Sequence, residues 1–256
     1  HPRRVSGLRV NAFTDHQRTY PVRIAKSHKP MFGDQCDHTE TSDSLIVNVQ
    51  DRISDLTIRV PSDAFASVNE RIAAPGARWY YASSETYVLA MVARALFGRS
   101  LIAVLQDRIW QPMGAEADAT WMTDRSGVEI GYMGFNAVLR DYARLGRLLA
   151  REGNWDGRQV IPRQWIKDAT TVRAEDEHLR PGRVSQGFGY GYQVWLLGGE
   201  PAGTYSLRGI RGQILFVDPV SRLIMVQTSA RPQPVDAGMA ENTALWRALV
   251  AQQRRD

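Results

Sequence analysis

Two adjacent tyrosines and two adjacent serines stand together in this chain, in the stretch Tyr80-Tyr81-Ala82-Ser83-Ser84. A serine hydroxyl is a weak nucleophile that needs a base within hydrogen-bond distance, and a tyrosine phenol can carry the proton in such a reaction. The stretch therefore has the groups for acyl transfer. Two aromatic side chains on a half-buried loop would give the same pattern without any chemistry, so the surrounding sequence has to separate the two interpretations.

Other reactive side chains are sparse. The single cysteine, Cys36, precedes Asp37 and His38. Adjacent Cys and His side chains do not form a metal-ligand set by themselves, so an ordinary loop is the favoured interpretation. One cysteine also excludes an intramolecular disulfide framework. We expect neither a bound metal nor an organic cofactor.

The composition is that of a globular domain. The chain has 256 residues, 43% of them hydrophobic, and a formal net charge of +5. Of its 32 basic residues, 29 are arginines that are scattered among acidic residues. Nucleic-acid binding normally requires a clustered basic face, so the sequence argues against a nucleic-acid partner and leaves the oligomeric state open.

The sequence contains no run of eighteen apolar residues, which would be needed for a membrane-spanning helix. No apolar run follows His1-Pro2-Arg3-Arg4, so we expect no signal peptide. These observations predict a soluble protein, with a cytoplasmic location slightly favoured.

The elements that must position the tyrosines and serines begin after a polar opening. Residues 1–43 are poorly patterned, and we find neither helical nor strand periodicity across Arg18 to Thr41. Two short β-branched segments then predict strands, and apolar residues at three- and four-residue spacing predict helices. The strands are 45–49 and 56–60, and the helices are 86–98, 101–110, 137–150 with Asn136 as N-cap, and 162–170.

The last third of the chain is typical of an antiparallel sheet. We predict four strands, a tight turn at Asp218-Pro219-Val220-Ser221, and a closing amphipathic helix from 239 to 252. An exposed hairpin is expected at 121–130, and a turn at 154–157. The four strands are 189–195, 204–210, 213–217 and 223–229. On the closing helix, Ala244, Leu245, Ala248 and Leu249 are expected to face the core.

Helices followed by an antiparallel meander and a final helix define an α+β class, with the C-terminal helix flanking the sheet. We divide the chain into a segment of residues 1–43 and a domain of residues 44–256.

Several short motifs, in a fixed order, resemble the serine β-lactamase and penicillin-binding-protein family, in the branch of 6-aminohexanoate-dimer hydrolases and related esterases. The resemblance covers roughly residues 71 to 232 and implies a β-lactamase-like fold with an incomplete N-terminal part. The motifs are Gly76 to Ser83, Ile109-Trp110-Gln111-Pro112-Met113-Gly114, Gly134 to Gly146 with its Arg140-Asp141-Tyr142-Ala143-Arg144, Gly153 to Pro162, and Gly189-Tyr190-Gly191-Tyr192.

The resemblance implies roles for the tyrosine motif. Tyr81 falls at the family's catalytic tyrosine, which helps to move the proton of the nucleophilic serine. Ser83 falls where the family has Asn or Ser, and Trp79 would contact the substrate. Neither Ser83 nor Ser84 lies in a Gly-x-Ser-x-Gly elbow, which disfavours either as the nucleophile.

Gly209-Ile210-Arg211-Gly212-Gln213 matches the third family motif, on the strand that lines the active site. The resemblance implies that Gly212 lets the substrate approach and that the Gln213 N–H donates to the oxyanion. Arg211 would hold a substrate carboxylate by two hydrogen bonds. A solvated charge on an edge strand is the equally weighted alternative for Arg211.

One family motif is missing. The family acylates a serine three residues before a lysine, and no Ser-x-x-Lys occurs in this sequence. The resemblance predicts a serine-type hydrolase that acts on a small ester, linear amide or β-lactam. The missing motif keeps a second hypothesis open, in which the chain is a non-catalytic binding module or remnant of the family.

Overall fold

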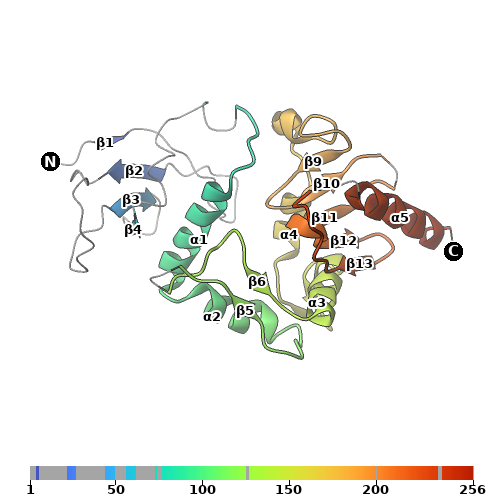
Figure 1. Cartoon of the computed structure of the whole chain (residues 1–256), viewed down its shortest axis with the longest axis horizontal. Coiled ribbons are helices and arrows are strands. Elements are labelled where there is room, and N and C mark those ends of the chain that lie inside the picture. The colour runs from blue at the N-terminus through green and yellow to red at the C-terminus, as the bar shows by residue number, and fades with distance from the viewer. Residues whose placement is uncertain are drawn as a thin grey trace. The chain divides into compact units, whose positions relative to one another are not determined.

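The computed structural model divides the chain into two compact units (Figure 1). The N-terminal unit comprises His1–Val104 and Trp121–Gly134, and the C-terminal unit comprises Leu105–Thr120 and Phe135–Asp256. The structure describes the backbone of four strands near the N-terminus, Ala73, and residues 77–124, 127–199, 201–235 and 238–255. Cys36, Asp37 and His38 lie outside the described residues.

The four N-terminal strands form one antiparallel sheet in the order β1-β2-β3-β4. The strands expected at 45–49 and 56–60 are confirmed as β3 and β4. We expected no strand between Arg18 and Thr41. This expectation is wrong, because β2 lies there and pairs with β3. The strand has only five residues, Val22 to Lys26, which is too short for an alternation of apolar and polar residues to stand out. The strands are β1 (Arg4–Val5), β2 (Val22–Lys26), β3 (Ser44–Val49) and β4 (Leu56–Pro61). The division at residue 43 stays a prediction.

The helix that follows the tyrosines is α1 (Ser83–Phe97). It ends at Gly98, whose φ of 60° is a left-handed conformation that glycine adopts without steric cost. α2 (Leu101–Leu105) follows and continues as the π-helical turn η2 (Gln106–Trp110), which confirms a helix at 101–110. The buried side chains of this part of the N-terminal unit are Tyr87, Val88, Ala90, Met91, Val92 and Leu101.

The hairpin expected at 121–130 forms, but it is not simply exposed. Thr123 and Glu129 bridge its two arms, and the Glu129 side chain is buried. Glu129 Oε2 lies 2.6 Å from Arg94 Nη1, and Glu129 Oε1 accepts a hydrogen bond from the Ile102 N–H. Burial alone would raise the pKa of Glu129, but the backbone hydrogen bonds and Arg94 outweigh it and lower the pKa. The carboxylate therefore ties the hairpin to α1 and to the start of α2.

A five-stranded antiparallel sheet is the centre of the C-terminal unit, in the order β13-β12-β11-β10-β9 (Figure 1). The strand expected at 189–195 is wrong in one respect. It is two strands, β9 and β10, because Gln193 adopts a φ of 59° and Gly191 N–H bonds to Val194 O, which reverses the chain. The strands are β9 (Phe188–Tyr190), β10 (Trp195–Leu197), β11 (Tyr205–Arg208), β12 (Ile214–Asp218) and β13 (Leu223–Gln227).

Apolar side chains cover both faces of this sheet because residues alternate along each strand. On one face Leu196, Leu215 and Val217 pack with Leu149 of α3 (Leu139–Ala150) and Ile166 of α4 (Arg163–Thr170). On the other face Ile214 and Phe216 pack with Trp246 and Val250 of α5 (Gly238–Gln253). The sheet with helices on both sides confirms the expected α+β class and the flanking C-terminal helix.

Short elements connect the larger ones. The turn expected at 154–157 is confirmed between β7 and β8, where Asn154 Oδ1 accepts a bond from the Gly157 N–H. Pro162 precedes α4, as expected. The remaining elements are β5 (Thr120–Trp121), β6 (Phe135–Asn136), β7 (Asn154–Trp155), β8 (Arg158–Gln159), η3 (Ala174–Leu179) and η4 (Ile210–Gly212).

Helix α3 corrects two expectations. Asn136 lies in β6 and is not the N-cap, a position that Val138 occupies without a side-chain hydrogen bond. The apolar spacing of residues 137–150 predicts that Leu139 lies on the buried side of this helix, but Leu139 is 48% exposed, whereas Asp141 is completely buried. A charged residue at the helix N-terminus looks solvated in a sequence, and only its partners explain why it is buried here.

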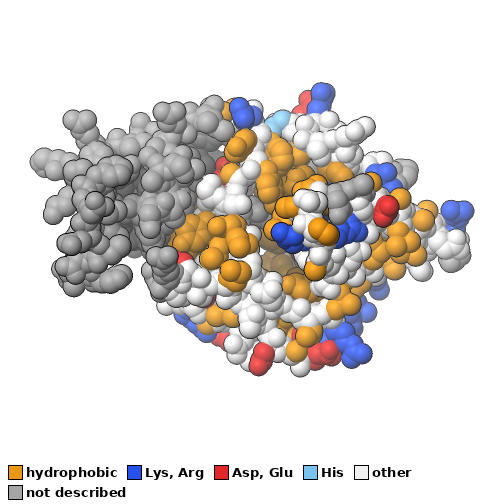
Figure 2. Space-filling model, viewed as in Figure 1, with side chains coloured by type: hydrophobic (Ala, Val, Ile, Leu, Met, Phe, Trp, Pro, Cys, Tyr) orange, Lys and Arg blue, Asp and Glu red, His pale blue; other side chains and the backbone are white. Residues whose placement is uncertain are grey.

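Helix α5 buries a different side from the one expected. Its buried residues are Asn242, Thr243, Trp246 and Val250, whereas Leu245 and Leu249 are 53% and 42% exposed. Hydrophobic side chains accordingly reach the surface over α5 (Figure 2). The helix carries two apolar stripes, and the one that contains the large Trp246 packs on the sheet.

Candidate functional site

The tyrosine motif forms the approach to helix α1. Tyr80 and Tyr81 are both 55% exposed, and the rings of Trp79 and Tyr81 lie 6.1 Å apart. Ala82 has an extended backbone and caps the helix without a side-chain hydrogen bond. Ser83 is exposed and is the first residue of α1. The structure therefore brings Trp79, Tyr81 and Ser83 together at one helix N-terminus, whose partial positive charge favours a developing anion.

The second group of predicted site residues occupies the connection between β11 and β12. The Gly209 N–H bonds to Gln213 O at 2.9 Å and closes a tight loop around η4. Arg211 and Gly212 both adopt left-handed conformations, with φ of 61° and 87°. A Cβ atom at Gly212 would lie 2.9 Å from Nε of the flexible Arg231 side chain, which would have to shift. The loop conformation thus depends on Gly212.

The Gln213 side chain holds this loop to the end of the sheet. Its Nε2 donates to Ser229 O, and its Oε1 accepts a 2.9 Å hydrogen bond from the Ser229 N–H. Gln227 Nε2 donates to Gly212 O at 3.0 Å. Among the described residues, the Gln213 N–H donates to no backbone or side-chain acceptor. This N–H group is therefore available to donate to an oxyanion, and its use in that role stays a prediction.

Arg211 is bound to main-chain carbonyls. Its Nη1 donates to Arg231 O at 3.0 Å and to Pro232 O at 2.7 Å, and its backbone N–H donates to Pro234 O at 2.8 Å. The side chain is exposed, and these bonds hold the segment after β13. Because the guanidinium bonds these carbonyls, Arg211 is not simply a solvated charge. Its contact with a substrate carboxylate stays a prediction.

The predicted site residues fall into two groups. Trp79, Tyr81 and Ser83 belong to the N-terminal unit, and Arg211, Gly212 and Gln213 belong to the C-terminal unit. Gln227 and Ser229, which support the second group, were not predicted. The sequence indicates them only weakly, because they are simply two polar residues at the end of the apolar strand pattern of β13.

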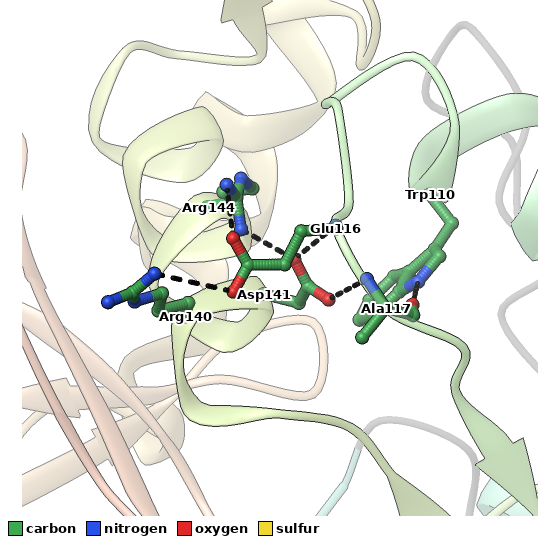
Figure 3. Close-up of polar contacts among 6 residues, drawn as sticks. All are labelled: Trp110, Glu116, Ala117, Arg140, Asp141 and Arg144. Carbon is green, nitrogen blue, oxygen red and sulfur yellow. Dashed lines mark hydrogen bonds and ion pairs between the residues drawn. The ribbon is translucent and has the colours of Figure 1, made fainter.

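The Arg-Asp-x-x-Arg motif of α3 forms a polar network in the C-terminal unit (Figure 3). Asp141 accepts hydrogen bonds from the backbone N–H groups of Glu116 and Ala117, at 2.9 and 3.1 Å, and from Arg144 Nη1 at 2.8 Å. Arg144 also bonds Glu116 at 2.9 Å, and Arg140 lies 3.9 Å from the same carboxylate. This part of the motif positions the loop after Gly114 and serves the fold.

Sequence and structure together define the class. The antiparallel sheet with helices on both faces is similar in fold to β-lactamase-like and penicillin-binding-protein-like structures. Residues 63–249 match the family model described as Beta-lactamase. The chain therefore belongs to the Beta-lactamase family.

Relatives place the chain within this family. It is 30% identical over 157 residues to a 6-aminohexanoate-dimer hydrolase of Paenarthrobacter ureafaciens, a match that covers 60% of this chain and 40% of the relative. A solved structure from Bacillus anthracis, which carries the name of a 6-aminohexanoate-dimer hydrolase, is 28% identical with a TM-score of 0.66. That match covers 73% of this chain and 47% of the Bacillus protein. The chain thus spans less than half the length of either relative.

A more distant structure shows the fold alone. A penicillin-binding-protein homologue of Caulobacter crescentus has a TM-score of 0.52 at 19% identity, over 66% of this chain and 57% of that one. The expected family and fold are confirmed by these comparisons.

Two further features bear on the class of site. No group of three or more His, Cys, Asp or Glu residues is placed to hold a metal ion within the described part of the chain. No single helix of that part is both long and apolar enough to cross a membrane, although α1 and the segment Leu101–Trp110 pass such a test when taken together.

Proposed function

We propose that this chain acts as a serine-type hydrolase, transferring the acyl group of a linear amide, an ester or a β-lactam to water. The observation that carries the proposal is the match to the Beta-lactamase family over residues 63–249. The two relatives named 6-aminohexanoate-dimer hydrolase make a linear amide the first substrate to test.

In this proposal Tyr81 moves the proton of the reaction. Its exposed phenol, at the N-terminus of α1, is accessible to a substrate. Ser83 lies two residues further on and offers a hydroxyl beside the reacting groups. The Gln213 N–H stabilises the oxyanion, while Trp79, Arg211 and Gly212 contact the substrate. Removing a positioned proton-transfer group lowers a rate by roughly 10²- to 10⁴-fold.

A second function has a specific observation in its favour. No serine of this sequence stands three residues before a lysine. A binding module that keeps the family's pocket residues without the nucleophile would hold the same ligands and release them unchanged. The two proposals differ in whether any substrate is turned over.

The test is hydrolysis of the 6-aminohexanoate dimer and of p-nitrophenyl acetate by the folded chain. Tyr81→Phe removes the proposed proton carrier, and Tyr80→Phe is the matched control because both phenols are 55% exposed. We expect a roughly 10²-fold or greater loss of kcat/KM in Tyr81→Phe alone. Equal rates in the two variants would overturn the role of Tyr81, and a folded but inactive wild type would favour the binding module.

A further inference from the structure

Two exposed aliphatic side chains flank one hydrogen bond next to the predicted oxyanion donor. The Arg211 N–H donates to Pro234 O at 2.8 Å, so Ile210 and Val235 each adjoin one of the two bonded peptide groups. Ile210 is 65% exposed and Val235 is 73% exposed. Within the part of the chain that the structure describes, only Val220, at 68%, is a comparably exposed large hydrophobic residue. Ile210 and Val235 thus give this place a small apolar surface, the Ile210–Val235 surface.

The backbone that carries this surface is held by several hydrogen bonds. Arg211 Nη1 donates to the carbonyls of Arg231 and Pro232, at 3.0 and 2.7 Å, and the Arg231 N–H donates to Arg211 O at 3.3 Å. The proline rings at positions 232 and 234 restrict the same segment further, because each fixes its own φ. A surface that is already ordered loses little conformational entropy when a ligand binds to it.

The surface is connected to the predicted oxyanion donor. Ile210 belongs to the tight loop that the 2.9 Å hydrogen bond from the Gly209 N–H to Gln213 O closes, and the Gln213 N–H lies at the other end of this loop. The Gln213 side chain also bonds Ser229, on the segment that leads to Val235. Both aliphatic residues therefore belong to the same hydrogen-bonded structure as the donor, within the C-terminal unit.

Packing of the fold does not explain these two aliphatic side chains. Neither Ile210 nor Val235 belongs to the apolar clusters of the C-terminal unit that the structure describes. Single hydrophobic residues scattered over a surface are normal, so either one alone would indicate nothing. Small-molecule sites, however, combine apolar side chains with a few placed polar groups, and here two apolar residues adjoin a loop with an available N–H group.

We propose that Ile210 and Val235 select substrates with an aliphatic acyl chain, which lies on the Ile210–Val235 surface while the Gln213 N–H holds the carbonyl oxygen. The acyl chain is bonded directly to that carbonyl carbon, so one substrate can make both contacts. This inference rests on the proposed hydrolase function. It narrows the substrate class from any small ester or amide to those with an extended apolar acyl group.

The test compares p-nitrophenyl hexanoate with p-nitrophenyl acetate as substrates of the full chain. A buried methylene group is worth about fourfold in binding, so we expect a hexanoate-to-acetate ratio of kcat/KM of roughly ten or more in wild type. Ile210→Thr and Val235→Thr keep a β-branched side chain and remove apolar area, and each should lower this ratio at least about threefold. Val220→Thr is the matched control, since Val220 is similarly exposed but lies beyond the other end of β12.

The ratios separate this inference from the proposed function. A wild-type ratio near one would overturn the inference, and so would a ratio that neither Ile210→Thr nor Val235→Thr lowers. An equal decrease in Val220→Thr would overturn it too. In each of these cases the chain still hydrolyses esters, so the proposed function stands.

A second measurement applies to an active and to an inactive chain. The chain, labelled with ¹³C in its methyl groups, is titrated with sodium hexanoate and, separately, with sodium acetate. The Ile210 and Val235 methyl resonances, assigned from the two variants, should shift with one common Kd for hexanoate and with a roughly tenfold higher Kd for acetate. Such shifts in a chain that hydrolyses neither ester would overturn the hydrolase function and keep the surface as a binding site. Methyl resonances that hexanoate leaves unchanged would overturn the surface in either case.

Discussion

Asp141 and Glu116 are 25 residues apart in sequence, yet the buried carboxylate of Asp141 accepts a 2.9 Å hydrogen bond from the Glu116 backbone N–H. Asp141→Ala would leave this N–H, the Ala117 N–H and one Arg144 contact unpaired. We expect a loss of about 3 kcal/mol in the free energy of unfolding, measured by urea denaturation. Asp156→Asn is the control, because the ion pairs of Asp156 with Arg147 and Arg151 are exposed and should cost less than about 1 kcal/mol, and Asn tolerates the left-handed φ of 47° at this position. Similar losses in both variants would contradict the structural role of the network.

Asp218 gives the fold a predictable dependence on pH. Burial alone would raise its pKa, but the hydrogen bonds from Arg254 and Ser221 outweigh burial and hold the pKa below its usual range. The folded state thus binds the proton less readily than the unfolded state. The resulting stability is present at neutral pH and is lost as the pH falls below about 4 toward the folded-state pKa.

Arg254→Met tests this linkage. The variant should be less stable than wild type at pH 7, and the difference in Tm should shrink as the pH is lowered through about 4 and below, because Asp218 then becomes protonated in both proteins. Arg183→Met should show little difference at any pH, since Arg183 is exposed and pairs only with Glu177 among the described residues. A difference in Tm between Arg254→Met and wild type that stays constant down to pH 2 would contradict the proposed linkage between Asp218 and stability.

Gly191 is predicted to be intolerant of any side chain. A Cβ atom there would lie 1.9 Å from Ala169 O, the backbone carbonyl near the end of α4. Gly191→Ala must therefore push the turn between β9 and β10 away from α4, and we expect a loss of about 3 kcal/mol. Gly98→Ala meets no atom within 4 Å and strains only a φ of 60°, so about 1 kcal/mol is expected. Urea midpoints of the two variants compare the costs, and an equal shift would contradict the close contact.

The Gln213 side chain should matter for catalysis through the position of its loop, a prediction that rests on the proposed function. Gln213→Ala removes both hydrogen bonds to Ser229 and lets the Gly209–Gln213 loop move. Small displacements of a positioned group can lower rates by up to about 10²-fold, and we expect a loss of kcat/KM with little change in Tm. Gln159→Ala, which removes two bonds from a β8 side chain to the carbonyls of Glu152 and Ile161, should leave the rate unchanged. A rate equal to wild type in Gln213→Ala would argue against this loop as part of the site.

Local patterns in the sequence were enough to predict most elements of the C-terminal unit. Pro162 and the turn at Asp218 in this unit, and Gly98 in the N-terminal unit, mark element ends through backbone preferences that act within a few residues. Strand β2 was not predicted, because five residues are too few to show a clear alternation. The division of 189–195 into two strands was not predicted either, because the sequence does not indicate the left-handed conformation of Gln193.

The side of a helix that is buried is decided by contacts with residues that are distant in the sequence. In α5, the stripe of Leu245 and Leu249 is as apolar as that of Trp246 and Val250, and stacking on Phe216 decides between them. In α3, Asp141 is buried because backbone N–H groups from a distant loop reach it. Composition and periodicity contain no information about such partners.

The candidate site could be predicted only in part. Tyr81 and Gly212 were proposed from short motifs, and their roles in a site stay predictions. The structure has Tyr81 just before α1 and Gly212 in a left-handed turn. The clamp between Gln213 and Ser229 was not predicted, because it joins residues from two strand ends whose proximity follows only from the sheet.

The central claim, acyl transfer by this chain, is tested most directly by intact-mass spectrometry of the folded protein after incubation with a fluorophosphonate and, separately, with a penicillin. The account predicts a single stoichiometric adduct that forms much more slowly in Tyr81→Phe than in Tyr80→Phe, and peptide mapping would then name the nucleophile. A folded chain that forms no adduct with either reagent would contradict the claim.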